Sequence, residues 1–492
     1  MDRVSWEHPY VPYVERDRMP KPQLRLLDPE DIEVIHENAI RLLEEVGLWI
    51  DNTEALSILE SEGAEVHGKM ARIPRDVVER ALKLAPSSFT LYDRRGKPYA
   101  VVGEGVTRFN PGSAATKILD YESGVPRNPT IKDLEQVARL TDYLSNIELQ
   151  STAVIPSDVP EELRDRVRLY VLLKQSIKPV VTGAFTVDGV HDMVRMMEIV
   201  IGDPAEKPYA IFDVCPSPPL KWSYVTCQNL LDCARRRVPV EVVPMPQLGA
   251  TSPVTIAGAL VQHHAEALSG LVLAQLTNPG TPVIYGGSPC QFDMFEATAN
   301  IVSPETMLLY MGYVEIARHL GLPTHAYLAL SDSKSTDYQA GVEAGFSAVI
   351  GVVESVDIVS GPGMLEFESV FSLEKLVLDD EVCGYARRLA RGFKIDEEHL
   401  AVDVIEDVCW ARSFLSHMHT VRMFREEHYV PHVFDRSRRR KAPSAFKRAH
   451  ERVREVLEKH EPESLPSDIE VELDRFAKEL FSARGIRMPN VQ

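Results

Sequence analysis

The sequence predicts an α/β protein: a (β/α)8 TIM barrel with an N-terminal α+β cap and a C-terminal helical extension. Three observations lead to this prediction. About eight short apolar segments each end in a loop of Gly, Ser, Asp or Pro. Amphipathic helical stretches separate these segments, as in parallel β/α proteins. The segments begin roughly 30 to 40 residues apart, which leaves room for one strand, one helix and two loops. An open doubly wound sheet is the alternative architecture, although no Gly-x-Gly-x-x-Gly motif follows a strand.

Composition narrows the class of protein. The 492 residues are 44% hydrophobic and 26% charged, as in soluble globular enzymes, and are enough for more than one domain. The formal net charge of -19 argues against binding to nucleic acid or to an anionic membrane. The six cysteines form no CxxC pair and no zinc-site spacing, which indicates a reducing compartment and no bound metal. Without a signal peptide or a long apolar run, we expect a cytoplasmic protein.

Residues 1–106 are expected to form an N-terminal arm and the α+β cap. Residues 1 to about 25 are rich in Tyr and Pro and should lie over a surface or a neighbouring subunit, which favours a homo-oligomer. A helix is expected from Asp28, a suitable N-cap, to Val46, and Gly47 should end it. Further elements are expected at about Thr53–Gly63 and Pro74–Ala85 (helices) and Phe89–Tyr92 (strand).

Residues 107–375 are expected to form the barrel. The expected strands are Thr107–Phe109, Ile147–Ile155, Pro179–Gly183, Tyr209–Asp213, Val238–Val243, Pro282–Tyr285, Thr324–Leu330 and Val356–Ser360. The expected helices are Ile131–Leu144, Glu162–Ser176, Val187–Ile201, Ser223–Arg236, Val254–Gln275, Pro304–Leu320 and Thr336–Val352. Parallel barrels carry their chemistry at the carboxyl ends of the strands, so the candidate site lies there.

Residues 376–492 are expected to form the C-terminal helical extension. A basic run from Arg436 to Lys441 and then Pro443 precede a highly charged helix. Two readings stay open: a solvated helix after a linker, or a docking surface for an acidic partner.

Candidate substrate-binding side chains cluster at the expected strand ends. Aromatic rings can hold a quaternary ammonium group by cation–π attraction, or can simply fill the core. Acidic and amide side chains could complement a cation, and Asp332 could instead pair with Lys334. The candidates are Phe212, Asp213, Gln247, Tyr285, Tyr327, Asp332 and Gln339.

Glycines at the same strand ends could let backbone or a large flat ligand approach closely, or could serve only in turns. These positions, with one serine, are Gly286, Gly287, Ser288, Gly361 and Gly363. No Gly-x-Ser-x-Gly elbow, His-x-His or HExxH motif is present, so we identify no catalytic acid or base and no metal ligand.

Several segments together resemble the trimethylamine methyltransferase superfamily over nearly the whole chain. They are Ile35–Glu37, Leu43–Gly47, Ala265–Gly270, Gln275–Leu276, Pro279–Gly286, Ser331–Lys334, Asp337, Gln339–Gly341, Glu343, His419–Thr420, Phe424–Glu426 and Pro431. The resemblance implies a TIM barrel that passes a methyl group from a methylated amine to the Co(I) corrinoid (cobalamin) of a cognate partner protein. His264 departs from the family, since an Asn is expected there in many relatives.

Trimethylamine-specific members carry pyrrolysine, whereas this chain reads through the loop after Leu330 with standard residues. It therefore resembles the non-pyrrolysine branch, whose characterised members act on quaternary amines such as glycine betaine. A quaternary amine leaves as a neutral amine, so the protein need only hold the cation, exclude water and aim one methyl group.

The expected reaction converts glycine betaine to dimethylglycine, and the glycines listed above would leave room for the partner's corrinoid ring. Carnitine, proline betaine or another quaternary amine is the alternative substrate. A barrel that binds betaine without catalysis is the alternative class of function.

Overall fold

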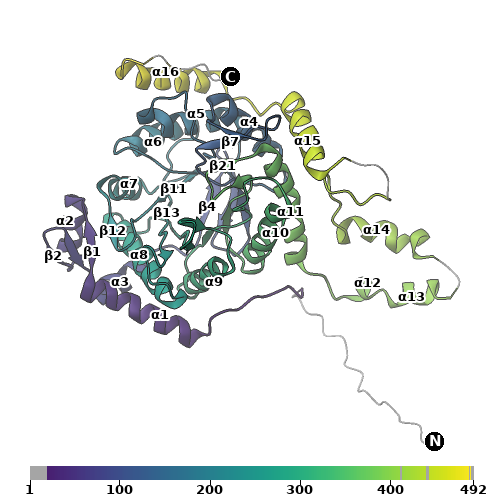
Figure 1. The fold of residues 1–492 in the computed structure, drawn as a ribbon, viewed down its shortest axis with the longest axis horizontal. Helices are drawn as coiled ribbons and strands as arrows, with labels where there is room; N and C mark the ends of the chain where they lie inside the picture. Colours follow the sequence, from purple (N-terminus) through teal and green to yellow (C-terminus); the bar gives the residue numbers. More distant parts are fainter. Residues whose placement is uncertain (1–18, 411–412, 439–442, 487, 489–492) are drawn as a thin grey trace, which may run out of the picture.

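Eight parallel strands close into a barrel at the centre of the computed structural model, which describes residues 19–410, 413–438, 443–486 and 488 (Figure 1). The strands are β6 (Arg108–Asn110), β9 (Gln150–Ser151), β10 (Val180–Thr182), β11 (Ala210–Val214), β13 (Val240–Val242), β15 (Val283–Tyr285), β18 (His325–Tyr327) and β19 (Ile358–Ser360). They pair in the orders β9-β10-β11-β13-β15 and β18-β19-β6.

Two contacts join these sheets into a ring. Tyr285 bridges Thr324 in parallel. On the other side, the Leu149 amide donates to the Phe109 carbonyl at 3.0 Å. These residues thus form a closed TIM barrel, and each of the eight expected segments overlaps one of its strands. The alternative prediction of an open doubly wound sheet is wrong.

Helices surround the barrel in the expected alternation (Figure 1). They are η2 (Glu161–Leu163, a 3-10 turn) with α4 (Ile131–Tyr143), α5 (Arg164–Gln175), α6 (Gly189–Val200), α7 (Tyr224–Arg235), α8 (Ile256–Thr277), α9 (Pro304–His319), α10 (Tyr338–Val353) and α11 (Leu373–Arg391). Local chemistry sets their starts: Asp337 caps α10 by accepting from the Ala340 amide. Because α11 runs through the boundary expected at residue 375, we propose that the barrel domain extends to Arg391.

The N-terminal cap packs mainly on α8 through α1 and α3. It comprises α1 (Pro29–Arg41), a π-helical turn (Leu42–Val46), β1 (Leu48–Ile50), α2 (Thr53–Ser61), β2 (Glu65–His67), β3 (Met70–Arg72) and α3 (Arg75–Leu84), and β12 (Lys221–Trp222) joins its sheet. Asp28 and Asp31 form a capping box, and Gly47 ends the turn at φ 79°. Residues 1–18 of the expected arm lie outside the described residues.

A hairpin of β4 (Phe89–Tyr92) and β5 (Pro98–Val102) closes the N-terminal end of the barrel. Leu91 and Val102 pack against inward side chains of the strands, including Val181. The Tyr92 amide donates to the Pro208 carbonyl at 2.7 Å, just before β11. The lower interior of the barrel is therefore apolar and filled.

Short strands rim the opposite, carboxyl end. They are β7 (Lys117–Leu119), β8 (Pro126–Arg127), β14 (Gln247–Leu248), β16 (Cys290–Asp293), β17 (Thr298–Asn300), β20 (Met364–Leu365) and β21 (Val370–Phe371). They form the sheets β20-β21-β7-β8 and β14-β16-β17. These loops supply the walls above the strand ends.

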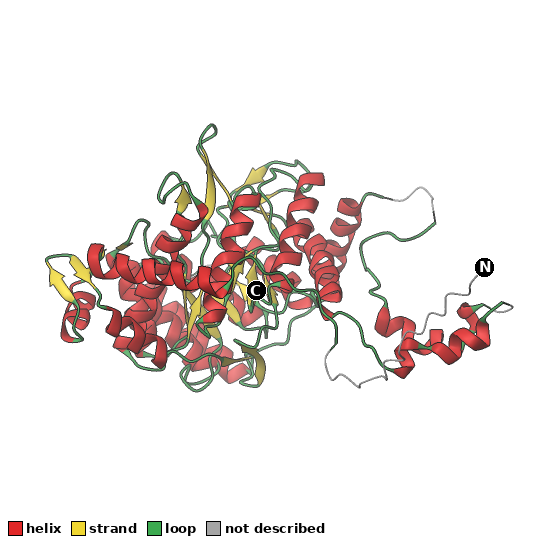
Figure 2. Cartoon of the chain, turned by 90° about the horizontal axis from the view of Figure 1, so that it is seen from below, coloured by secondary structure: helices red, strands yellow, loops and turns green. Residues whose placement is uncertain are grey.

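The C-terminal helices are α12 (Glu397–Leu400), α13 (Val402–Val408), η3 (Phe414–Ser416, a 3-10 turn), α14 (Met418–Glu427), α15 (Ala445–Lys459) and α16 (Ser467–Ala483). The segment α12–α14 stands away from the barrel in both views (Figures 1 and 2), whereas α15 packs on α11 and α16 on α6. Residues 439–441 of the expected basic run lie outside the described residues. Among the helices that are described, none is long and apolar enough to cross a membrane.

Candidate active site at the barrel mouth

Alternation along the strands decides which side chains enter the barrel. On β11, Ile211 joins the lower plug, Phe212 joins the outer core, and Asp213 faces inward again. The same alternation brings acidic, imidazole, phenol, hydroxyl and amide groups into the upper interior. These groups belong to Asp213, Glu241, His325, Tyr327, Ser360 and Asn110, and they come from five different strands.

A chain of hydrogen bonds crosses this interior. Glu241 Oε1 bonds to His325 Nδ1, and His325 Nε2 lies 2.6 Å from Ser360 Oγ. Ser360 Oγ donates to Asn110 Oδ1 at 2.8 Å. Asn110 Nδ2 donates to the Pro111 carbonyl at 3.0 Å, which fixes the orientation of the amide. Because the Ser360 hydroxyl donates its proton to Asn110 Oδ1, Ser360 Oγ must accept the hydrogen bond from His325 Nε2–H.

Protonation of the remaining groups follows from burial. Burial lowers the pKa of His325 to about 4, so its imidazole is neutral at pH 7 and Nδ1 is an acceptor. Glu241 must then donate to Nδ1, in agreement with the burial that raises its pKa well above the usual value. Burial and the neighbouring Glu241 also raise the pKa of Asp213, which shares a hydrogen bond with Glu241. Burial therefore favours the protonated forms of Asp213 and Glu241, whose protons a cation could displace.

We infer a solvent-accessible hollow above these hydrogen-bonded groups from the exposure of residues around the strand ends. The Cys215 side chain is exposed, yet burial raises the pKa of its thiol to about 12. A group that protein surrounds but solvent still reaches lies on the wall of a deep hollow. Asp213 and Glu368 are likewise partly accessible. Burial, together with Asp332, Asp213 and Glu241, raises the pKa of Glu368 to about 8.

The carboxyl groups around the hollow lack donors. Apart from the bond between Asp213 and Glu241, no described N–H or O–H group donates to Asp213 Oδ1, Glu241 Oε2 or Glu368 Oε1, although solvent does not reach these atoms. Unmet carboxyl oxygens in a buried site are costly, and a cation compensates for them. The Tyr327 ring lies beside them, edge-on to His325 with ring centroids 4.8 Å apart. The arrangement suits an organic cation.

Arg168 on α5 is a site residue that the sequence reasoning missed. It is 1% exposed, donates from Nη2 to the Thr152 carbonyl and lies over the Phe185 ring at 4.8 Å. Its Nε and Nη1 have no described acceptor. The nearby carboxylates, Asp165 and Asp213, are charge neighbours. No arginine was expected at a strand end; this one reaches the mouth from a helix, within a run of otherwise apolar residues.

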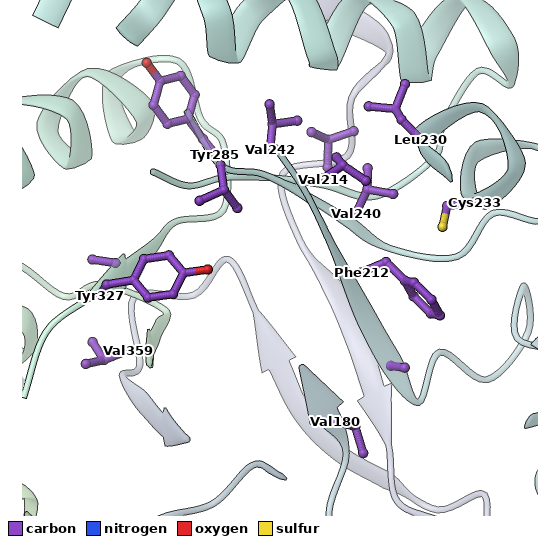
Figure 3. Packing of buried hydrophobic residues seen from close by; sticks show 14 of the residues in the cluster. Val180, Phe212, Val214, Leu230, Cys233, Val240, Val242, Tyr285, Tyr327 and Val359 are labelled. Atoms are coloured by element: carbon purple, nitrogen blue, oxygen red, sulfur yellow. The ribbon is translucent and has the colours of Figure 1, made fainter. Parts of the chain in front are cut away.

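Two of the predicted aromatic residues point away from the hollow. Phe212 lies in the outer core with Leu230 and Cys233 of α7 (Figure 3). The Tyr285 ring turns toward the helices, away from the Tyr327 ring (Figure 3). The expected cage of three rings is therefore corrected, because two of its members lie on the outer faces of their strands and only Tyr327 faces inward.

Tyr285 belongs to a separate polar network. Its hydroxyl lies 2.8 Å from His264 Nδ1, and His264 Nε2 lies 2.8 Å from His36 Nδ1. His263 lies 3.4 Å from the same hydroxyl. His264 thus ties the N-terminal helix α1 to the barrel.

The other predicted polar residues anchor loops. Asp332 accepts from the amides of Ile301 and Val302 at 3.2 and 3.0 Å, and burial raises its pKa to about 6. Gln339 is exposed and donates to Glu343 at 2.8 Å. Gln247 forms a turn through its backbone, whose carbonyl accepts from several following amides. Among the predicted polar residues, Asp213 faces the hollow, and both Asp213 and Asp332 are charge neighbours of Glu368.

Neighbouring atoms of the protein occupy the space beside each of the predicted glycines. A Cβ at Gly286, Gly287 or Gly361 would overlap Glu241, His263 or the Leu328 carbonyl, respectively, and one at Gly363 would lie 2.6 Å from the Phe371 ring. Ser288 is buried, 3.3 Å from the Tyr310 hydroxyl. These five residues do not fit the expected role of leaving room for a corrinoid ring, because the space beside each is occupied by neighbouring side chains or backbone.

Comparison with known proteins decides the family. The model of the protein family described as "Trimethylamine methyltransferase (MTTB)" matches residues 5–481 of the chain. The chain belongs to the trimethylamine methyltransferase family. This family member is 32% identical over 464 residues to the glycine betaine methyltransferase of Desulfitobacterium hafniense (strain Y51), covering 92% of this chain and 97% of that one. It is also 32% identical over 469 residues to the trimethylamine methyltransferase MttB of Methanosarcina barkeri, covering 91% and 93%.

Solved structures agree on the fold of this family member. The Methanosarcina barkeri monomethylamine methyltransferase (MtmB) superposes with a TM-score of 0.51 over 88% of each chain, at 11% identity. At that identity the likeness concerns the TIM barrel alone. The expected resemblance is confirmed, and the protein is a methyltransferase by family.

Proposed function

We propose that this methyltransferase moves one methyl group from a quaternary amine, with glycine betaine as the leading substrate, to the Co(I) corrinoid of a partner protein. One observation carries the proposal: an acidic hollow with unmet carboxyl oxygens and one inward aromatic ring, Tyr327, at the carboxyl end of a TIM barrel. The name of the Desulfitobacterium relative, glycine betaine methyltransferase, supports this choice of substrate.

The hollow offers both charges of a betaine a partner. The carboxyl groups of Asp213, Glu241 and Glu368 surround the place for the trimethylammonium group. The free N–H groups of Arg168 suit the substrate's carboxylate. Trimethylamine lacks the carboxylate, so this pairing favours a zwitterion over a simple amine.

The chain's residues would orient the substrate without transferring a proton to it. The corrinoid of the partner would supply the nucleophile. As the C–N bond breaks, its electron pair stays on nitrogen and neutralises the positive charge, so dimethylglycine leaves without an acid. Holding the cation with one methyl group toward the mouth supplies the orientation that such a displacement needs. A cytoplasmic homo-oligomer that docks a cognate corrinoid protein completes the proposal.

The test mixes purified protein, glycine betaine and chemically reduced cobalamin, with carnitine, proline betaine and trimethylamine in parallel. The absorbance of methylcobalamin and the amount of dimethylglycine should rise together, one for one. Transfer from another betaine alone would change the substrate and keep the reaction. Binding of betaines without transfer, even with corrinoid proteins added, would instead indicate a binding barrel and contradict the proposal.

A further inference from the structure

The hairpin after the eighth barrel strand has an unusual tip. Between β20 and β21, Glu366, Phe367 and Glu368 follow one another at φ 47°, 58° and 63°. None is a glycine, and this left-handed region is unfavourable for every L-residue. Three such residues in a row persist only where the surrounding structure holds them.

Contacts with the loop after β18 hold the tip. The Glu366 amide donates to the Ser333 carbonyl at 2.9 Å. Lys334 Nζ lies 4.0 Å from the centre of the Phe367 ring and donates to the Asp332 carbonyl at 2.9 Å. The Ser369 amide returns to the Glu366 carbonyl at 3.0 Å. The loop after β18 and a hydrogen bond within the tip therefore hold its backbone in place.

Glu368 is the member of the tip that reaches the hollow. Its Oε1 is cut off from solvent and has no described donor, while the residue as a whole stays partly accessible. Its charge neighbours are Asp332, Asp213 and Glu241. Glu241 is 1% exposed and also has an oxygen, Oε2, without a donor beyond Asp213. The carboxyl group of Glu241, on a strand, and that of Glu368, on the rim, are therefore neighbours, and each has an oxygen that lacks a hydrogen-bond donor or has Asp213 as its one possible donor among the described residues.

We propose that Glu368 is a specificity-determining residue, which sits over the substrate's ammonium group and makes the site prefer a trimethylammonium cation to a neutral group of the same shape. This inference rests on the proposed function. It assigns part of the recognition of the substrate's positive charge to the rim, in addition to the carboxyl groups on the strands. A quaternary ammonium group has no N–H to donate, so directional hydrogen bonds cannot recognise it. Only charge and shape can, and Glu368 adds a carboxyl group from the rim to those of Asp213 and Glu241 on the strands.

The chemistry of the ligand offers a direct test. In 3,3-dimethylbutanoate, a neutral tert-butyl group replaces the trimethylammonium group of glycine betaine, while the carboxylate and overall shape are kept. Titration calorimetry of the full-length protein with each ligand measures the preference for charge as a ratio of two Kd values. Neither measurement requires the corrinoid partner.

Glu368→Gln should raise the Kd for glycine betaine about tenfold or more, because a charge contact in a site of low dielectric is removed. The Kd for 3,3-dimethylbutanoate should change less than about twofold, since its tert-butyl group carries no positive charge for Glu368 to contact. Glu366→Gln is the matched control: it lies on the same strained tip, two residues away, and should leave both Kd values unchanged. Equal melting temperatures of the two variants would show that both tips remain folded.

Two results would overturn the inference. Equal weakening of both ligands by Glu368→Gln would indicate a loss of shape only, and no weakening would place the cation elsewhere. If the unmodified protein binds no betaine at all, the proposed function itself fails; if it binds betaine and Glu368→Gln keeps the preference for charge, only the role of Glu368 fails.

Discussion

A Cβ atom on Gly286 would overlap Oε1 of Glu241, the oxygen that bonds to His325. The carboxyl group of Glu241, on the neighbouring strand β13, occupies the place where a side chain would stand, so the first residue after β15 must be a glycine. Gly286 has no positive φ, so steric contact alone, and no backbone strain, decides the matter.

Gly286→Ala should displace Glu241 and break its bond to His325. We expect a loss of about 1–3 kcal/mol in the free energy of unfolding, as in other overpacked interiors, measured by urea denaturation. Gly341→Ala in α10 is the control, because a Cβ there meets no atom within 4 Å. That change should stabilise the protein by up to about 1 kcal/mol, since Ala is the better helix former. Similar losses at both sites would contradict the contact.

Ser360→Ala should leave His325 Nε2–H without an acceptor inside the barrel. An unmet buried donor costs about 1–3 kcal/mol, again in the free energy of unfolding. Ser57→Ala on the exposed face of α2, where Oγ donates only to the Thr53 carbonyl, should change stability by less than about 0.5 kcal/mol. A loss at Ser360 no greater than at Ser57 would mean that the hydrogen-bonded chain contributes nothing.

Tyr327→Leu should weaken the binding of quaternary ammonium ligands by roughly 2- to 30-fold, because a cation–π contact is worth about 0.5–2 kcal/mol. Phe212→Leu removes a ring of the outer core, so it should lower stability while the Kd of glycine betaine stays constant. Calorimetry and thermal melts on both variants separate these effects. If Phe212→Leu weakened the binding of betaine as strongly as Tyr327→Leu, the assignment of inward and outward rings would be wrong.

The affinity for betaine should rise with pH between about 6 and 8. Without a bound cation, burial and the carboxyl groups of Asp332, Asp213 and Glu241 raise the pKa of Glu368 to about 8. Lys334, on the neighbouring loop, lies over the Phe367 ring of the same tip. The carboxyl is thus protonated at pH 7 in the free protein. A bound cation favours the ionised form and lowers this pKa, so binding releases a proton below pH 8.

One released proton corresponds to at most about a tenfold gain in affinity per pH unit, and the gain ends above the free pKa of about 8. Calorimetry in buffers with different heats of ionisation counts the protons directly. Glu368→Gln should remove this contribution, and 3,3-dimethylbutanoate should release no proton from Glu368. A flat pH profile for the unmodified protein would refute the protonation assigned to the hollow.

The barrel could be predicted from sequence because each strand is a short apolar run that ends abruptly in polar residues. The inner and outer faces could not be assigned, because strands buried on both sides lack an alternating pattern. Phe212 and Asp213 are adjacent, and nothing in the sequence says which of them faces inward. The Tyr285 ring was misplaced for the same reason.

Two of the site residues that were missed, Arg168 and Glu368, lie outside the strand ends. Arg168 reaches the mouth from α5, and Glu368 reaches it from the tip of a hairpin. The residues of that tip have a left-handed backbone, but none is a glycine, so the sequence does not indicate the turn. Only the tertiary arrangement brings either residue to the hollow. Sequence could predict a candidate site at the carboxyl end of the barrel, but not the groups that surround it.

The β4–β5 hairpin has a kinetic consequence. It plugs the N-terminal end with apolar side chains, so a substrate held inside the barrel can enter and leave only at the mouth. A corrinoid protein docked over that mouth would block the same passage. The proposed reaction should therefore follow a compulsory order, with the amine bound first and the demethylated product released only after the partner departs.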